Sequence, residues 1–278
     1  MINNPLFGQA FFIVWRESIE AMLVIGILYS WIKSNPQAFN AQKYLWFGVG
    51  AGLVAAVILG TIIMGFSSVL EGNAQEYFHL IIVSIAAILI VQMVFWMRQH
   101  GRYLKSELHQ ELNIKLQDQS WWGIFFLSAI AIAREGSETV IFLYGVGQGL
   151  KDFFSIQYFT GGALIGFILA GFTFYLLQLG YQYFSWRTFF RITEIILLFL
   201  AAALFMTAID KMISLEWIPI TDNLWDTSFI LDDHMLGGLL PALTGYKAQP
   251  TLIEGLLYAG YWIIIIYFLY RTRQAKIK

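Results

Sequence analysis

Residues 131–142 read AIAREGSETVIF. The stretch is hydrophobic and lies inside a longer apolar segment, yet it carries Arg134, Glu135 and Glu138. A charged side chain at the centre of a lipid bilayer is costly even on lenient insertion scales. We therefore expect these residues to face the interior of a helix bundle, where they find partners or a ligand.

An earlier stretch, FIVWRESIEAMLVI at residues 12–25, repeats the arrangement. Its charged residues are Arg16, Glu17 and Glu20, so both stretches contain the pattern Arg-Glu-x-x-Glu at an offset of 118 residues. In a helix, residues three or four positions apart share a face. The two glutamates of each copy therefore project together, and the arginine is close enough to pair with the second glutamate.

The composition indicates an integral membrane protein. The chain has 278 residues, of which 58% are hydrophobic and 13% charged, and its mean hydropathy is +0.65. A soluble domain has roughly a quarter charged residues. Seven apolar segments approach or exceed the roughly 20 residues that a membrane-spanning helix needs: 7–32, 43–66, 77–97, 121–147, 156–180, 190–213 and 252–270. The alternating strands of an outer-membrane barrel are absent, so we expect an all-α bundle of seven transmembrane helices.

Several classes of site and partner are excluded or not indicated. The chain has no cysteine, which excludes disulfides, thiolate metal ligands and iron–sulfur clusters. The net charge of −1 gives no indication of a nucleic-acid partner. The first apolar segment is long, lacks a basic start and carries charges, so we expect a retained helix rather than a cleaved signal peptide. Membrane lipid is a predicted partner, and no oligomeric state is indicated.

Positive charges are sorted by loop. Four segments hold 2, 4, 2 and 4 of the 17 Lys and Arg residues: 33–43, 98–120, 181–191 and 271–278. Loops rich in Lys and Arg lie in the cytoplasm. We therefore expect a multi-pass protein of the cytoplasmic (inner) membrane with its N-terminus outside and its C-terminus in the cytoplasm, which agrees with an odd number of helices.

Two connecting segments have patterns of their own. Residues 98–119 are charged and carry leucines four residues apart, which is typical of an amphipathic helix on the membrane surface or against the bundle. The longest loop, 214–251, is acidic and expected to be extracytoplasmic. Its segment 229–246, FILDDHMLGGLLPALTGY, is too apolar for a free linker and too short to span, so we expect a re-entrant or interfacial piece.

The same offset of 118 residues relates positions outside the charged motifs, because Glu76 aligns with Glu194 and Gly48 aligns with Gly166. Three helices separate the two copies, so the first and fourth helices run in opposite directions. We expect a 3+3 inverted repeat plus one C-terminal helix, a layout typical of transporters with the site between the halves. The single membrane domain, 1–278, then comprises repeat 1 at about 7–97, repeat 2 at about 121–213, the extracytoplasmic loop 214–251 and helix 7 at about 252–270.

Each motif has a net charge of −1, so two motifs that face one cavity carry −2. Like charges in a low-dielectric site repel each other unless a cation or protons neutralise them, and carboxylate oxygens suit hard cations. The predicted cation ligands near the membrane midplane are Glu17, Glu20, Glu135 and Glu138. The alternative is that the motifs form structural ion pairs between helices, although each motif keeps one acid in excess after pairing.

Two further acids extend the predicted pathway. Glu76 begins the third helix on the outer side and Glu194 begins the sixth on the inner side, so each is placed to pass on a cation or to carry protons. The alternative is that both are helix-start acids favoured by the helix dipole. Asp210 precedes Lys211, with which it is expected to pair, and His79 lies one turn beyond Glu76, where an interhelical contact is expected.

The two copies, RESIE and REGSE, resemble the R-E-x-x-E motif of the oxidase-dependent iron permeases, the iron/lead transporter family that includes the bacterial Efe-type ferric iron permeases. The stretches QEYF, MVFWMR and WDTSFILDDHMLGGLL are also similar to this family, so the resemblance covers essentially the whole chain. It implies a secondary transporter that imports Fe³⁺ across the cytoplasmic membrane. Neither a prosthetic group nor enzymatic activity is implied.

Carried over by position, the resemblance implies that the motif glutamates are iron ligands and that Arg16 and Arg134 support them. It extends to Glu76, but where some relatives have Glu-Gly three residues later, this chain has His79 and Leu80. Family members are often supplied by an extracytoplasmic iron-oxidising or iron-delivering protein, and the resemblance implies such a partner here.

Two alternatives remain open. Carboxylate ligands also accept other metals, such as Fe²⁺, Mn²⁺ and Pb²⁺, so the transported ion is not settled by ligand type alone. A membrane-embedded di-iron oxidase also uses carboxylates from two helices. Such sites usually add Glu-x-x-His pairs, and neither motif has the histidine.

Overall fold

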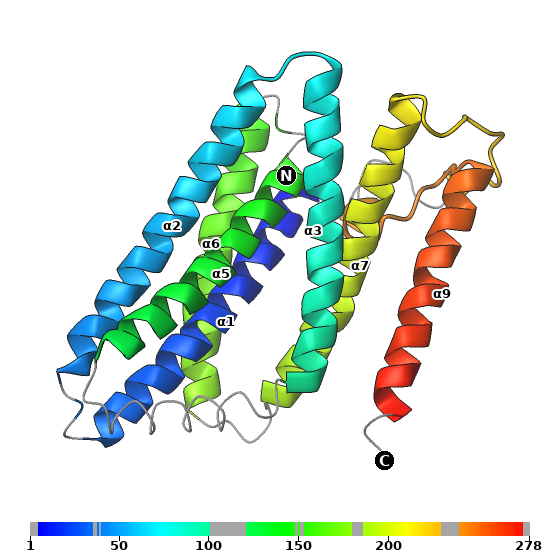
Figure 1. Ribbon diagram of the computed structural model, residues 1–278. Helices are drawn as coiled ribbons and strands as arrows, with labels where there is room; N and C mark the ends of the chain where they lie inside the picture. The colour runs from blue at the N-terminus through cyan, green and yellow to red at the C-terminus, as the bar shows by residue number, and fades with distance from the viewer. Residues whose placement is uncertain are drawn as a thin grey trace.

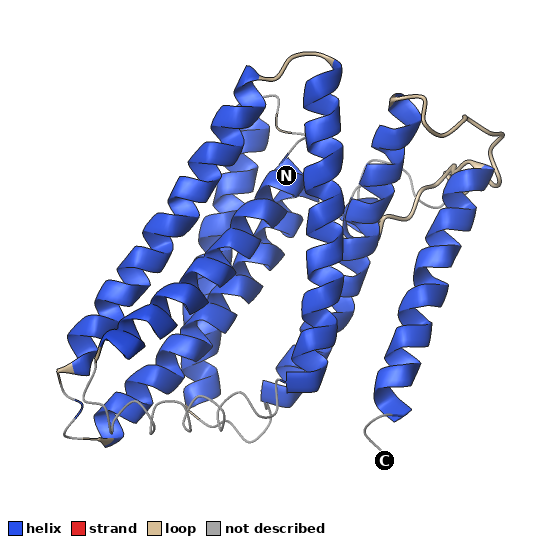
Figure 2. Ribbon diagram, viewed as in Figure 1, coloured by secondary structure: helices blue, strands red, loops and turns tan. Residues whose placement is uncertain are grey.

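The structure is a computed structural model that describes residues 5–35, 38, 40–100, 121–147, 150, 153–179, 186–228 and 239–274. Its described elements are helical (Figures 1 and 2): α1 (Pro5–Ser34), α2 (Ala41–Val69), α3 (Asn73–His100), α5 (Trp122–Val146), α6 (Phe153–Gln178), α7 (Trp186–Ser214), α8 (Leu239–Thr244) and α9 (Leu252–Gln274). Within these residues the β structure is limited to one isolated bridge, between Asn223 and Thr251. Each predicted apolar segment overlaps one long helix, so the all-α class is confirmed.

Five of the described helices are long and apolar enough to cross a membrane: α2, α3, α6, α7 and α9. The helices α1 and α5 have 30 and 25 residues, but each carries the three charged residues of its motif. The predicted total of seven crossings therefore requires α1 and α5 to span the membrane with their charges turned away from lipid.

Four helices form two closely packed pairs, because α1 lies against α6 and α2 lies against α5. A Cβ atom on Gly48 of α2 would lie 2.4 Å from the Phe125 carbonyl oxygen of α5, and one on Gly162 of α6 would lie 2.5 Å from the Phe7 carbonyl oxygen of α1. Small residues thus let the backbones meet. In this packing Gly48 occupies the place of Gly162 and not that of Gly166, because the stretch between the charged motif and the glycine is shorter in the second half, from 134 to 162 rather than from 16 to 48.

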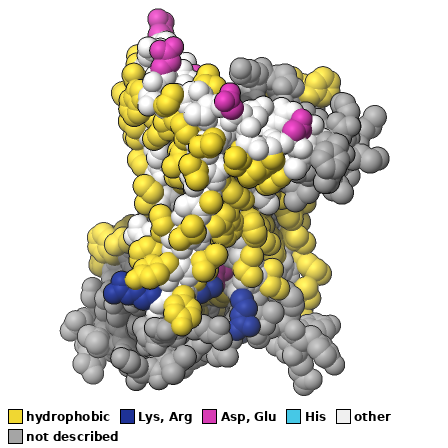
Figure 3. Space-filling view, turned by 90° about the vertical axis from the view of Figure 1, so that its right-hand side faces the viewer, with side chains coloured by type: hydrophobic (Ala, Val, Ile, Leu, Met, Phe, Trp, Pro, Cys, Tyr) yellow, Lys and Arg dark blue, Asp and Glu magenta, His cyan; other side chains and the backbone are white. Residues whose placement is uncertain are grey.

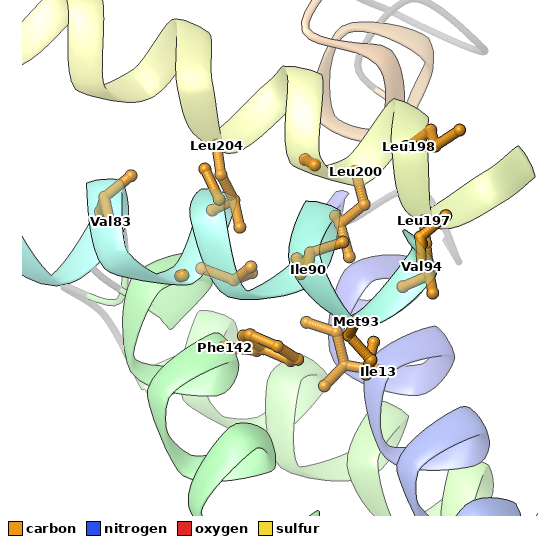
Figure 4. Packing of buried hydrophobic residues seen from close by; sticks show 14 of the residues in the cluster. Ile13, Val83, Ile90, Met93, Val94, Phe142, Leu197, Leu198, Leu200 and Leu204 are labelled. Atoms are coloured by element: carbon orange, nitrogen blue, oxygen red, sulfur yellow. The ribbon is translucent and has the colours of Figure 1, made fainter. Parts of the chain in front are cut away.

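The largest cluster of buried hydrophobic residues lies where α3 and α7 meet α1 and α5. Figure 4 shows Ile90 and Met93 of α3 close to Leu200 of α7, Ile13 of α1 and Phe142 of α5. In contrast, only 11% of the apolar window of α9 is buried, against 61% of that of α7. The core therefore surrounds the α3–α7 pair, and α9 presents its apolar side chains outward, as a lipid-facing helix does.

The segment that follows α7 returns to the bundle. The short helix α8 packs against α7 and α1, and the Gln9 side chain donates a hydrogen bond to the Ala242 carbonyl oxygen. Gly245 has a φ of 71°, and a Cβ atom there would lie 2.8 Å from the Ala202 carbonyl oxygen in the middle of α7, so only glycine fits. The segment predicted to be re-entrant or interfacial is thus packed on helices from residue 239 onward. Its first part, and the predicted amphipathic helix beyond residue 100, lie outside the described residues.

The charges separate along the bundle on the face shown in Figure 3. Most of the acidic side chains visible there lie at the upper end, Lys and Arg lie near the lower end beside a small acidic area, and hydrophobic side chains cover the region between the two ends. Figure 1 shows the start of α1 toward the upper end and the end of α9 at the lower end. This separation matches the loop pattern from which the membrane orientation is predicted.

Candidate metal site

The two charged motifs come together where α1 and α5 pack against each other. Each motif lies near the middle of its helix, and the glutamate side chains are turned into the bundle interior. Glu17 is 1% exposed, Glu20 is 7% exposed, and Glu135 and Glu138 are each 8% exposed. All four predicted ligands are therefore buried inside the protein.

Three of the four glutamates form a cluster. One carboxylate oxygen from each of Glu17, Glu135 and Glu138 lies within 4.8 Å of the other two. Glu17 comes from α1 and the other two come from α5, so the cluster joins the two copies of the motif. Oxygen atoms at this separation can bind one metal ion between them.

Each arginine pairs with glutamate in its own motif. Arg16 Nη1 donates to Glu17 Oε1 at 2.7 Å, and its Nη2 forms an ion pair with Glu20. Arg134 Nε donates to Glu138 Oε1 at 3.0 Å. The predicted pairing of each arginine with the second glutamate is therefore present in both copies. Glu20, the fourth predicted ligand, is directed to Arg16 and is not part of the three-carboxylate cluster.

The glutamates carry more charge than the arginines neutralise, because four glutamates and two arginines leave a formal charge of −2. Among the described residues, the Oε2 atoms of Glu17, Glu135 and Glu138 are buried and have no hydrogen-bond partner. A buried polar atom without a partner costs about 1–3 kcal/mol, and more when it is charged. A hard cation bound between these oxygens removes both this cost and the mutual repulsion of the carboxylates.

The helix α3 contributes two contacts that sequence reasoning did not identify. Arg16 Nη1 lies 3.0 Å from the Met93 sulfur, and the Arg134 Cζ atom lies 4.7 Å from the centroid of the Trp96 ring. Met93 and Trp96 are three residues apart and share a face of α3. Their spacing is visible in the sequence, but it does not indicate which helix they face.

The two predicted pathway acids lie in ion pairs at opposite ends of the α3–α7 pair. Glu76, near the start of α3, accepts a hydrogen bond from Lys211 Nζ, near the end of α7, at 2.5 Å. Glu194, near the start of α7, pairs with Arg98, near the end of α3. Glu194 also lines a cavity of about 20 Å³ together with Arg16, and this volume is enough for one water molecule. Glu194 is therefore linked to the first motif by a small cavity.

Asp210 does not pair with the lysine that follows it. It accepts a hydrogen bond from Lys247, which also donates to Glu254 Oε1 at 2.8 Å. The expected pair is wrong because Lys211 is directed to Glu76 on α3, and Lys247 from the following loop lies beside Asp210 instead. Burial opposes the charged form of Lys247, but the hydrogen bonds and charges of its two acidic partners outweigh burial and raise its pKa above 10.5. This cluster ties the loop to α7 and α9.

His79 lies in contact with two other helices. Its Nε2 atom is 3.5 Å from the Ser67 hydroxyl of α2, and its ring centroid is 6.0 Å from that of Tyr144 on α5. The Tyr144 hydroxyl donates to the Ser67 hydroxyl at 2.5 Å. The interhelical contact expected for His79 is therefore present, and His79 is not part of the three-carboxylate cluster.

The chain is similar to known proteins along most of its length. Residues 7–276 match the family described as the iron permease FTR1 family. The chain is 31% identical over 253 residues to the ferrous iron permease EfeU of Escherichia coli O6:K15:H31 (strain 536 / UPEC), which covers 88% of each chain. It is 29% identical over 270 residues to the ferrous iron permease EfeU of Yersinia pestis, which covers 93% of this chain and 92% of that one. No solved structure gives a significant match. This multi-pass membrane protein therefore belongs to the iron permease FTR1 family, and it is a transporter rather than an enzyme.

Proposed function

We propose that the protein is a secondary transporter that imports iron across the cytoplasmic membrane, and that the ion binds between Glu17, Glu135 and Glu138. The observation that carries this proposal is the cluster itself. It consists of buried carboxylates from two helices within 4.8 Å of one another, each with an oxygen that has no hydrogen-bond partner among the described residues. Membership of an iron permease family supports iron as the ion.

Glu20 is the fourth ligand in this proposal and joins the others when the ion arrives. Its carboxylate interacts electrostatically with Glu138 and Glu135, although its ion pair is with Arg16. An incoming cation repels the Arg16 guanidinium and attracts the Glu20 carboxylate, so the ion pair weakens as the metal binds. Arg16 and Arg134 thus stabilise the carboxylates when the ion has left.

The proposed form of the ion is Fe³⁺. Carboxylate oxygens are hard donors, and a site with a formal charge of −2 attracts a trivalent ion more strongly than a divalent one. Fe²⁺ is the second candidate, because both relatives described above are named ferrous iron permeases.

Uptake into proteoliposomes distinguishes the two oxidation states. Iron is offered as ferric citrate or as Fe²⁺ held reduced by ascorbate, with Mn²⁺ and Pb²⁺ as competitors. Faster uptake of the ferric form supports the first candidate. Uptake that requires ascorbate supports the second, and equal inhibition by Mn²⁺ supports a general divalent-metal transporter.

The proposed architecture is a 3+3 inverted repeat followed by a seventh helix. A two-fold axis for this repeat relates α1 to α5, α2 to α6 and α3 to α7. It therefore maps the α1–α6 contact onto the α2–α5 contact, and these are the two most extensive helix contacts. The glycine-to-carbonyl contact occurs in both of these pairs. Rocking of one half against the other then provides alternating access. The charge separation in Figure 3 supports an outside N-terminus and a cytoplasmic C-terminus.

In this architecture Glu76 and Glu194 mark the outer and inner ends of the ion path. The ion pair of Glu76 with Lys211 and that of Glu194 with Arg98 occupy equivalent places at opposite ends of the α3–α7 pair. A passing cation must displace the lysine or the arginine, so each pair closes its end of the path when no ion is present. The cavity between Glu194 and Arg16 supports Glu194 as the exit acid.

An extracytoplasmic iron-oxidising or iron-delivering protein is the proposed source of the ion. The loop between α7 and α9 exposes Glu216, Asp222 and Asp226 in its described part. Hydrogen bonds from Ser228 and Gln249 lower the pKa of Asp226, so this carboxylate stays ionised at neutral pH. Exposed carboxylates at this end of the bundle are suited to receiving a cation from such a partner.

The site assignment is tested by uptake of radioactive iron into proteoliposomes that contain Glu17→Gln or Glu138→Gln. Loss of a group that merely supports a metal site typically lowers metal affinity about 10–100-fold, so each variant should lose at least that much at limiting iron. Glu71→Gln, in the exposed turn between α2 and α3, is the matched control and should transport normally. Normal uptake by Glu17→Gln, with equal amounts of folded protein, would contradict the site.

A further inference from the structure

The two copies of the motif differ in how their arginines are held. Arg16 is 2% exposed and contacts both glutamates of its copy. Arg134 is 42% exposed, and its ion pair among the described residues is with Glu138. Glu135 therefore contributes to the cluster without a direct arginine partner in the described part of the chain.

Arg134 has the reach to bind Glu135. In the first copy, Arg16 Nη1 lies 2.7 Å from its sequence neighbour Glu17, and the same local helix geometry exists at residues 134–135. Burial does not restrict Arg134 to one position, because much of its side chain is exposed. If Arg134 contacted Glu135 as well as Glu138, as Arg16 contacts both glutamates of its copy, a second of the three clustered carboxylates would be paired and the attraction of the site for a cation would weaken.

A ring on α3 opposes this movement. The Arg134 Cζ atom lies 4.7 Å from the centroid of Trp96, within the range of a cation–π interaction, while its Nε atom donates to Glu138 at 3.0 Å. The indole face and the Glu138 carboxylate therefore fix the guanidinium from two directions. Met93, one turn earlier on α3, contacts Arg16 and lies beside Ile13 of α1 in Figure 4, so one face of α3 reaches both arginines.

We propose that Trp96 is a positioning residue of the cation site, which holds Arg134 on Glu138 and so leaves Glu135 available to bind the ion. This inference rests on the proposed function, because it concerns the same three carboxylates. Loss of the indole releases Arg134 toward Glu135 and weakens binding of the ion. The expected signature is a higher KM for iron with a nearly unchanged maximal rate of uptake.

The test compares Trp96→Leu, which removes the ring, with Trp96→Phe, which keeps an aromatic face. In proteoliposome uptake at varied iron concentration, Trp96→Leu should raise KM about 3–10-fold, while Trp96→Phe should stay within about twofold of the wild type. Trp46→Leu, at an exposed position of α2, is the matched control, and Trp96→Met replaces the leucine variant if that variant does not fold. An unchanged KM in Trp96→Leu, or equal losses in the leucine and phenylalanine variants, would overturn the proposal.

A double-mutant cycle with Arg134→Gln separates positioning from general damage to the bundle. Without a guanidinium to hold, Trp96→Leu should leave the KM of Arg134→Gln unchanged, and independent multiplicative effects would overturn the proposal. Glu138→Gln in the same series distinguishes failure of the proposed carboxylate site from failure of the proposed role of Trp96. If Glu138→Gln loses uptake while Trp96→Leu keeps the wild-type KM, the carboxylate site stands and the role of Trp96 is wrong. If Glu138→Gln transports normally, the site itself is wrong.

Discussion

Removal of Arg16 should destabilise the protein more than removal of Arg134, although both arginines occupy the same position in their motifs. Either arginine variant changes the formal charge of the site from −2 to −3, but Arg16 is 2% exposed and pairs with two buried glutamates, so Arg16→Met leaves two buried carboxylates without their partner. Breaking a buried ion pair by removing one partner costs about 3–5 kcal/mol. Arg134 is 42% exposed with one ion pair, so its loss should cost only about 1–2 kcal/mol, the sum of a partly solvated pair and a cation–π contact.

The assay is equilibrium unfolding of the purified variants in detergent, with urea or guanidinium as denaturant. A third variant, Arg16→Met/Glu20→Gln, returns the formal charge of the site to −2 and should recover at least about half of the lost stability, because the cost arises from the unpaired charge. Equal destabilisation by Arg16→Met and Arg134→Met, or no recovery in the double variant, would refute the reasoning from burial and charge.

Three further predictions concern other parts of the bundle. Lys211→Glu should slow iron uptake because the new carboxylate repels Glu76, with which Lys211 forms an ion pair. The exchange Glu76→Lys/Lys211→Glu restores opposite charges and should recover part of the uptake rate. A double variant as slow as the single one would contradict the proposed closing pair. Gly48→Val should cost about 1–3 kcal/mol of unfolding free energy, because a Cβ atom at Gly48 would lie 2.4 Å from the α5 backbone. Gly50→Ala on the same helix is the control. A Cβ atom there has no neighbour within 4 Å, so this variant should be neutral or stabilising. The pKa of Lys247 in the folded protein is raised above 10.5, its value in the unfolded chain. The ion pairs of Lys247 should therefore contribute their full stability at pH values below the unfolded-state pKa. This contribution should be lost as the pH rises through the folded-state pKa. The difference in melting temperature between the wild type and Lys247→Met should therefore stay constant from about pH 6 to pH 9 and shrink above about pH 10.5.

The features that depend on one helix are predictable from the sequence. Each long helix requires a run of apolar residues, and the predicted segments therefore overlap the helices of the structure. The pairing of Arg16 with Glu20 follows from their spacing of four residues, because the partners lie one turn apart on the same helix. Burial of the four motif glutamates follows from the cost of charge in lipid.

The features that depend on packing between helices are not predictable in this way. Asp210 lies beside Lys211 in the sequence, yet its partner is Lys247, 37 residues away. The contact between Trp96 and Arg134 requires α3 to pack on α5, and no spacing rule gives that arrangement. The same limit applies to the three-carboxylate cluster, because Glu20 and Glu138 have the same spacing in their motifs, yet Glu138 belongs to the cluster and Glu20 does not.

The position of iron in an experimental structure of the iron-loaded protein tests the central claim most directly. The anomalous signal at the iron absorption edge should lie between Glu17, Glu135 and Glu138, with carboxylate oxygens as the nearest atoms. Iron found at a different place in the bundle, such as between Asp210 and Glu254, with the three carboxylates still unliganded, would contradict the account.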